Sequence, residues 1–152
     1  MKATIALARE GKIKENASIR DQRSIIINAP IDKVWSVLTD VGNWSNWNQE
    51  VKNLKLSTES AVGSEFQWKI GKMNARSVIQ LMDANQIFSI TCKSSLVERI
   101  YVWTLEEDEA QTIATVSTSL QGLFAILIAS HQEVHSELLN WLECLKQEAE
   151  KS

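Results

Sequence analysis

Residues 25–35 read Ile-Ile-Ile-Asn-Ala-Pro-Ile-Asp-Lys-Val-Trp and join two kinds of secondary structure. The β-branched run from Ser24 to Asn28 predicts a strand, and Pro30 ends it because proline cannot donate a ladder hydrogen bond. Pro30 also suits the first turn of a helix. Apolar residues then recur at helical spacing, which predicts a short helix to about Thr39: Ile31, Val34, Trp35 and Leu38.

A second short helix and a run of strands are predicted next. Trp44 and Trp47 lie three residues apart, on one face of a helical piece. From Val51 onward the apolar period becomes two, with turns at residues 71–72 and 83–85. Strands that follow one another without helices indicate an antiparallel meander of about six strands. In each predicted strand, alternate residues lie on one face. The groups, strand by strand, are Phe66, Trp68 and Ile70; Ala75, Ser77, Ile79 and Leu81; Phe88, Ile90 and Cys92; Tyr101, Trp103 and Leu105; and Ala114, Val116, Thr118 and Leu120.

The remainder, from about Leu123 to Glu150, is predicted to be one long helix. Its apolar stripe follows a 3.6-residue period, and Glu133, Glu137, Lys146 and Glu150 lie off it. Such a stripe must be buried, and the sheet is the large surface available, so the sequence predicts an α+β fold. The stripe consists of Phe124, Leu127, His131, Val134, Leu138, Trp141, Leu142 and Leu145.

Length, composition and charge limit the kinds of protein that this chain can be. With 152 residues, of which 44% are hydrophobic and 23% charged, the chain fits a single domain over 1–152, with 1–13 as an N-terminal extension. A net charge of -3 and a pI near 5.4 disfavour nucleic acid as a partner. Cys92 and Cys144 form no CxxC pair and no disulfide framework, which suits a reduced compartment.

Targeting signals are not evident in the sequence. The apolar stretch from Ala3 to Ala8 is cut off by Arg9 and Glu10, so it is too short for a signal peptide. No apolar run approaches the roughly 20 residues needed to span a bilayer. We therefore expect a cytoplasmic protein that does not insert into membranes, as a monomer or homodimer.

The order of these segments, with its signature residues, resembles the SRPBCC superfamily (START-like, Bet v 1-like, helix-grip), in its polyketide cyclase/dehydrase-type branch. The resemblance runs from about Lys14 to Glu150. It rests on residues 25–35 with Asp40, Trp44 and Trp47; on Gly63, Phe66 and Trp68; on residues 102–105; on the corner from Ser119 to Gly122; and on residues 141–146.

The resemblance implies a sheet curved around the last helix, with a cavity between them that binds a small hydrophobic molecule of lipid, polyketide or aromatic type. Two cavity positions depart from the family pattern: Tyr101 stands where relatives often have His, and Thr118 where they often have Glu. The residues expected to line the pocket are Phe66, Trp68, Ser77, Ile79, Phe88, Ile90, Arg99, Tyr101, Trp103, Val116, Thr118, Leu127, His131 and Val134.

His131 is the sharpest polar signal. It lies within the apolar stripe, so it either orients a ligand in the cavity or is a core histidine that is hydrogen-bonded to a neighbour such as Tyr101 or Thr118. His131 and His135 are four residues apart, but the text between them is not HExxH and no third ligand is evident. We therefore expect neither a metal nor a cofactor.

Other polar and aromatic candidates have two interpretations each. Arg99 shares a strand face with Tyr101 and could pair with a ligand carboxylate, or it could be solvated near a strand end. Trp68, Tyr101 and Trp103 could form an aromatic wall for a ligand, or they could be core. Trp44 and Trp47 could gate the cavity mouth or pack the short helices onto the sheet.

Three functions remain open from the sequence. The first is binding of a small hydrophobic molecule in an internal cavity, and a cavity filled by side chains would argue against it. The second is a cyclase or dehydratase type of enzyme that uses His131 and Tyr101 as an acid/base pair. The third is a protein-interaction module without a ligand, which an exposed apolar patch would favour.

Overall fold

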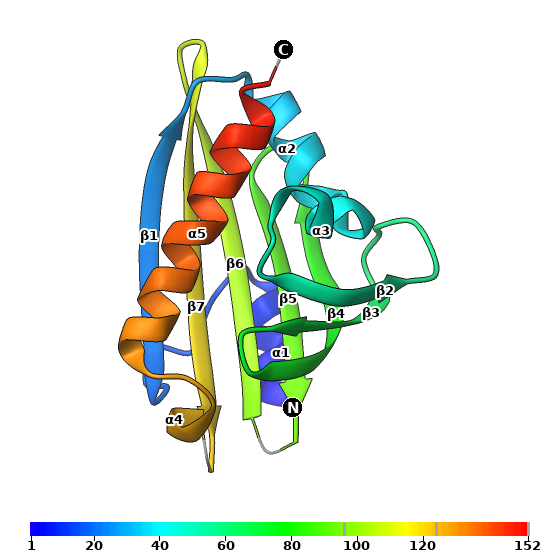
Figure 1. Cartoon of the computed structure of the whole chain (residues 1–152), viewed down its shortest axis with the longest axis vertical. Helices are drawn as coiled ribbons and strands as arrows, with labels where there is room; N and C mark the ends of the chain where they lie inside the picture. The colour runs from blue at the N-terminus through cyan, green and yellow to red at the C-terminus, as the bar shows by residue number, and fades with distance from the viewer. Residues whose placement is uncertain (96, 124, 152) are drawn as a thin grey trace.

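The computed structural model describes residues 1–95, 97–123 and 125–151, without the side chains of Leu127 and Ile128. The elements follow the predicted order of strand, short helices, strands and closing helix (Figure 1). They are α1 (Lys2–Arg9), β1 (Ile19–Ile27), α2 (Ile31–Thr39), the 3₁₀ turn η1 (Val41–Asn43), α3 (Trp44–Trp47), β2 (Val51–Leu56), β3 (Glu65–Ile70), β4 (Met73–Asp83), β5 (Ile87–Ser94), β6 (Val97–Asp108), β7 (Gln111–Gly122), α4 (Ala125–Ile128) and α5 (His131–Ala149).

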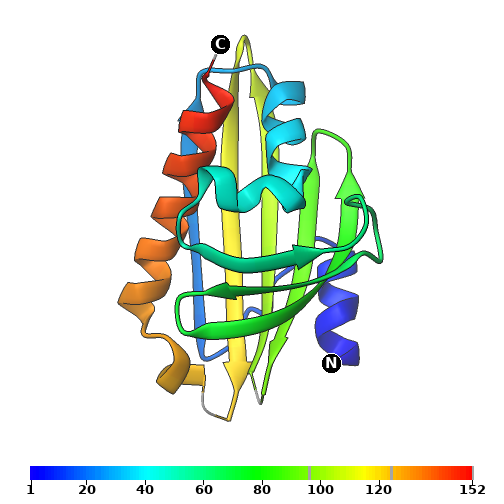
Figure 2. The same cartoon turned by 45° about the vertical axis from the view of Figure 1, so that its right-hand side comes forward.

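One antiparallel sheet carries all seven strands in the order β1-β7-β6-β5-β4-β3-β2. From β2 to β7, consecutive strands pair with each other, as the meander prediction requires, and β1 closes the far edge against β7. The sheet curves around α5, and β2 and β3 cross in front of its concave face (Figures 1 and 2). The predicted α+β helix-grip architecture is confirmed.

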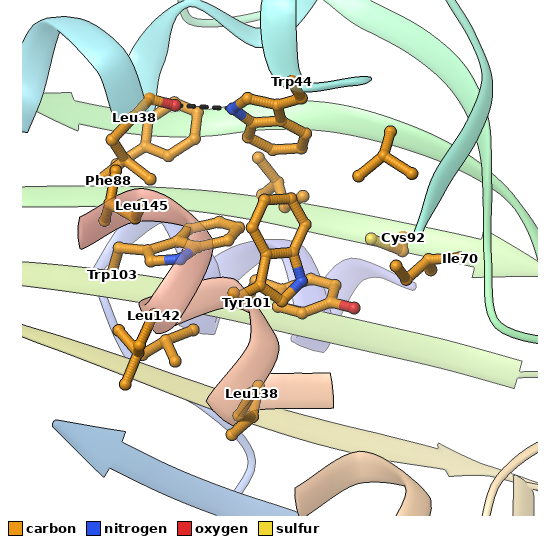
Figure 3. Packing of buried hydrophobic residues seen from close by; sticks show 14 of the residues in the cluster. Leu38, Trp44, Ile70, Phe88, Cys92, Tyr101, Trp103, Leu138, Leu142 and Leu145 are labelled. Carbon is orange, nitrogen blue, oxygen red and sulfur yellow. Dashed lines mark hydrogen bonds between the residues drawn. The ribbon is translucent and has the colours of Figure 1, made fainter. Parts of the chain in front are cut away.

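The core lies between the concave face of the sheet and α5. It is dominated by aromatic rings from β3, β5, β6, α3 and α5. Figure 3 shows the rings from β5, β6 and α3 near leucines from α5. Trp44 of α3 sits at the centre: its indole N–H donates to the Leu38 carbonyl over 2.8 Å, and its ring lies 4.9 Å from that of Trp141. Trp44 is therefore a core residue, whereas Trp47 is half-buried against Trp141.

The prediction of one helix from Leu123 is wrong. The structure has the short helix α4 and then a break before α5, which begins at His131. Ser130 caps α5 with a capping box, because its hydroxyl accepts from the Glu133 N–H over 3.1 Å while the Glu133 carboxylate accepts from the Ser130 N–H. The stripe prediction at Phe124 and at the Leu127 side chain lies outside the described residues.

Helix α1, which no pattern in the sequence predicts, packs on the opposite face of the sheet from α5 (Figure 1). Ala8 is buried with Ile100 and Val102, and the Ser89 hydroxyl donates to the Ala8 carbonyl over 2.6 Å. Thr4 donates a hydrogen bond to the Glu98 carboxylate at the other end of the helix. No helix in the described ranges has the length and apolar character needed to cross a bilayer.

The Thr4 contact makes the attachment of α1 depend on pH. The hydrogen bond from Thr4 holds the pKa of Glu98 below its ordinary value of 4.5. A carboxylate whose pKa is lower in the folded state stabilises the fold above the ordinary value, and this contribution is lost as pH falls through the folded-state pKa. We expect Glu98→Gln to lower the free energy of unfolding by up to about 1 kcal/mol near pH 7, because the side chain is partly exposed.

Urea unfolding of both proteins from near pH 7 to about pH 2 tests this expectation. The difference between wild type and Glu98→Gln should shrink as the pH falls below 4.5. Glu106→Gln, an exposed position on the same strand, is the matched control and should show no such trend. A difference that stays constant over this range would show that the Glu98 charge does not stabilise the docked helix.

Candidate functional site

Alternate residues of β6 point into the space between the sheet and α5. Arg99, Tyr101 and Trp103 share this face because side chains on a strand alternate between its two sides. The Arg99 guanidinium lies 4.1 Å from the centre of the Tyr101 ring, and the Tyr101 ring stacks on Trp103 at 5.2 Å and 10°. The three side chains form a column that leads from a buried charge into the aromatic core.

Glu137 of α5 meets this column at its charged end. Arg99 is 2% exposed, and its two terminal nitrogens donate to the two carboxylate oxygens of Glu137 over 2.9 and 3.0 Å. Its Nε donates to the Thr118 hydroxyl over 2.9 Å, and the Thr118 hydroxyl donates to the Ile100 carbonyl. Bidentate pairing of this kind fixes both charged groups in one orientation. All three guanidinium nitrogens therefore have protein partners.

The Tyr101 hydroxyl also donates to the Glu137 carboxylate. Burial raises the pKa of the Tyr101 phenol well above its ordinary value of 10, although the Arg99 charge acts in the opposite direction. Burial alone would lower the pKa of Arg99, but the Glu137 carboxylate keeps it above its ordinary value. The phenol is thus a neutral donor, and Arg99 and Glu137 form a charged pair.

A pocket of about 450 Å³ opens over this ion pair, at the N-terminal end of α5. We call it the α5 pocket. One wall is the β3–β4 turn with Gly71, whose positive φ of 58° suits glycine, and the other is the first two turns of α5. Its apolar lining includes Ile70, Met73, Leu120 and Ala129. Its polar lining includes Ser136, Arg99 and Glu137.

Carboxylates outnumber cations around the α5 pocket. Glu50, Glu133 and Glu137 line it together with two cations, Arg99 and Lys72. Lys72 lies 3.9 Å from Glu133, and both side chains are well exposed. Burial, and then the neighbouring charge of Glu137, raise the pKa of Glu50. Three carboxylates against two cations leave one excess negative charge when all five groups are ionised.

The structure does not gather the sequence-predicted pocket residues around a cavity. Arg99 lines the α5 pocket, whereas Tyr101 and Thr118 lie behind it in the network with Glu137. Trp68, Phe88 and Trp103 pack against other rings with centroids 5.2 to 6.3 Å apart. Phe66, Trp68 and Ser77 also border two other pockets along β2–β4. The aliphatic members are core residues with 0% exposure: Ile79, Ile90, Val116 and Val134.

His131 is not in the core or in the α5 pocket. It is the first residue of α5 and is exposed. The structure therefore corrects both the cavity placement of His131 and its pairing with Tyr101, whose hydroxyl is taken by Glu137. His135 contacts Asp21 and Arg23 on the β1 side. Leu127 lies outside the residues whose side chains are described.

Metal binding and thiol chemistry find no support in the parts of the chain that the structure describes. There, no three His, Cys, Asp or Glu side chains gather as ligands. Cys92 and Cys144 are free. Burial raises the pKa of the Cys92 thiol to about 12, so this cysteine is protonated and is no nucleophile at neutral pH.

Glu137 is the site residue that the sequence analysis missed. It was placed off the apolar stripe, yet it lies three residues after Val134 and four before Trp141, which are both buried on the core side. The signal that could have placed it was the text Ser130-His131-Gln132-Glu133, a capping box that marks the helix start. With that start, residue 137 falls in the second turn, opposite the charged end of β6.

A family model described as polyketide cyclase/dehydrase and lipid transport matches residues 18–134, from just before β1 into α5. The chain belongs to this family. The resemblance inferred from residues 25–35 and the tryptophans is thereby confirmed. The family covers both cyclase-type enzymes and lipid transport, so membership supports binding of a hydrophobic ligand or a cyclase-type role. A search of curated proteins found no match.

Solved structures share the fold at low sequence identity. A hypothetical protein from Helicobacter pylori matches with a TM-score of 0.76 and 14% identity, covering 90% of this chain and 91% of that one. A START superfamily protein from Mycobacterium smegmatis matches with a TM-score of 0.72 and 9% identity, covering 86% of this chain and 97% of that one. The ZhuI aromatase/cyclase from Streptomyces sp. R1128 matches with a TM-score of 0.73 and 14% identity, covering 86% of this chain and 93% of that one. These likenesses establish the helix-grip fold.

Proposed function

We propose that the protein binds a small, partly apolar molecule in the α5 pocket, with the polar group of the ligand against Arg99 and Glu137. The observation that supports this most is a buried ion pair at the base of a pocket whose lining combines polar and apolar side chains. Small-molecule sites typically combine apolar lining with a few convergent polar groups. Ile70, Met73 and Leu120 supply the apolar part of the lining, and each is at most 2% exposed.

The ion pair can recognise a ligand without losing its own contacts. Each terminal nitrogen of Arg99 gives one hydrogen bond to Glu137 and carries a second N–H, and the Glu137 Oε1, which does not accept from Tyr101, has a further lone pair. Perturbed ionisable groups at the base of a cleft mark functional sites more often than chance. The proposed site therefore offers both donors and acceptors to one polar group.

The other two functions have less support from the geometry. An enzyme that uses His131 and Tyr101 is not supported, because His131 is exposed and Tyr101 bonds to Glu137 behind the pocket. A protein-interaction module would use exposed apolar side chains, and Leu123 and Ile126 are 78% and 67% exposed. These two side chains precede Ala129 of the pocket lining in the sequence, and neither lines the α5 pocket.

Native mass spectrometry, combined with thermal shifts against a library of small amphipathic compounds, tests this proposal. Ser136→Trp places an indole in the pocket without touching the core, since Ser136 is exposed and lines the pocket. We expect it to weaken binding of the library hits at least about tenfold. Gln147→Trp, at an exposed position further along α5, is the matched control and should bind like wild type. Equal loss in both variants, or none in either, would contradict the proposed site.

A further inference from the structure

The interior beyond the α5 pocket is closed by five aromatic side chains that we call the aromatic plug: Trp44, Trp68, Tyr101, Trp103 and Trp141. They come from α3, β3, β6 and α5, so elements far apart in the sequence converge on one point. Figure 3 labels three of them, Trp44, Tyr101 and Trp103. Each is at most 3% exposed. The plug occupies the space where a helix-grip sheet and its helix would otherwise enclose a deep cavity.

Trp141 is the plug residue that shares α5 with Glu137, and it lies outside the lining of the α5 pocket. It lies one helical turn beyond Glu137, on the same side of α5, because residues four apart are neighbours on a helix. Its ring is 6.3 Å from Tyr101, 6.1 Å from Trp68 and 5.5 Å from Trp103. The Arg99 guanidinium covers the face of the Tyr101 ring that is turned toward the pocket. A molecule in the α5 pocket that reached deeper would therefore meet Tyr101 and then Trp141.

Trp103 and Trp141 are held in the plug by ring packing. The Trp141 ring pairs are T-shaped, with interplanar angles of 65° to 78°. Such edge-to-face pairs are more favourable than their buried area alone accounts for, by about 0.5–1.5 kcal/mol each. Within the described residues, the buried indole N–H groups of Trp103 and Trp141 have no hydrogen-bond acceptor. No hydrogen bond thus ties these two rings, and their position depends on the fit between neighbouring rings.

The charges of the pocket restrict the polar group of the ligand. A ligand carboxylate would have to compete with Glu137 for Arg99, and it would lie near Glu50 and Glu133. Bringing a further negative charge among these groups is unfavourable when one carboxylate is already in excess. A hydroxyl, amide or amine can donate to Glu137 without this repulsion.

We infer that the α5 pocket selects short ligands with an uncharged or cationic polar group, and that Trp141 sets the length limit. This inference rests on the proposed function. It excludes long-chain acyl ligands and free fatty acids as occupants, even though the chain belongs to a family whose description includes lipid transport. Trp141 acts as a specificity-determining residue because its ring fills the space that a longer chain would need.

A series of primary alcohols from butanol to dodecanol tests the length limit by NMR titration. Each methylene that leaves water for an apolar site strengthens binding by about fourfold. In wild type we expect the affinity to rise over the first alcohols of the series and then to reach a plateau, once the alkyl chain of the alcohol has filled the pocket. In Trp141→Ala the gain should continue to longer alcohols. Trp35→Ala, a half-buried tryptophan outside the plug, is the matched control and should keep the wild-type plateau.

A matched set of hexanol, hexylamine and hexanoate tests the charge restriction. We expect hexanoate to bind at least about tenfold more weakly than hexanol, and hexylamine to bind no more weakly. If Trp141→Ala does not fold, Trp141→Leu gives a smaller void, and the wild-type plateau is a test by itself. A gain that continues to dodecanol in wild type, or tight hexanoate binding, would overturn the inference and leave the proposed function intact. Binding of none of these probes at Arg99 or Ser136 would contradict both.

Discussion

Glu137→Ala is expected to lower the free energy of unfolding by about 3–5 kcal/mol, the largest effect of any single change at the site. Removing one partner of a buried ion pair leaves the other charge unpaired in a medium that solvates it poorly. Arg99 is 2% exposed and Glu137 is 12% exposed, so water compensates little. The Tyr101 hydroxyl also loses its acceptor. Urea unfolding followed by tryptophan fluorescence measures this change.

Two controls separate the lost pair from a general effect on α5. Glu143→Ala removes an exposed carboxylate from the same helix and should change the free energy of unfolding by less than about 0.5 kcal/mol. The double variant Arg99→Leu with Glu137→Leu should recover most of the stability, because two apolar side chains leave no buried charge. A Glu137→Ala protein as stable as wild type would show that the pair is solvated in solution.

Trp44→Ala is expected to cost about 3–5 kcal/mol through the cavity that it leaves in the core. The Trp44 ring lies within 6.3 Å of five other aromatic rings, so no neighbour can fill the space without losing its own contacts. The Leu38 carbonyl would lose the indole N–H that donates to it. Thermal and urea unfolding should both show the loss, with partial exposure of the core.

Trp44→Phe separates ring packing from the hydrogen bond. It keeps an aromatic ring in the core but removes the donor to Leu38, so its cost should be smaller than that of Trp44→Ala and should include the roughly 1–3 kcal/mol of an unsatisfied buried acceptor. Trp35→Ala removes a half-buried ring on α2 and should cost less than Trp44→Ala. Equal costs for Trp44→Ala and Trp35→Ala would contradict the central position of Trp44.

Local periodicity was enough to predict most of the fold. The proline after β1, the helical spacing from Ile31 and the period of two from Val51 each reflect chemistry within a few residues. Helix α1 escaped prediction because its stability comes from the outer face of the sheet, through Ala8, Ile100 and Val102. The start of α5 was misplaced because apolar residues on both sides of Ser130 continue the helical spacing across the cap.

The site was harder to predict than the fold for a physical reason. Periodicity identifies which side chains face inward, but it does not say whether they enclose a space or fill it. Tyr101 and Trp103 face inward as predicted, and they fill the interior only because Trp44 and Trp141 arrive from two other elements. Arg99 was identified from its strand face, whereas its partner Glu137 needed the helix start that the capping box defines.

The central claim is that a ligand binds over the Arg99–Glu137 pair while the aromatic plug stays closed. A ¹⁵N-resolved NMR titration with hexanol tests it most directly, because it reports on the pocket and the plug at once. The backbone amides of Arg99, Leu120 and Ser136 should shift in a saturable way, and the indole N–H signals of Trp103 and Trp141 should stay nearly unchanged. Large shifts of those two indole signals with silent pocket amides would contradict the account.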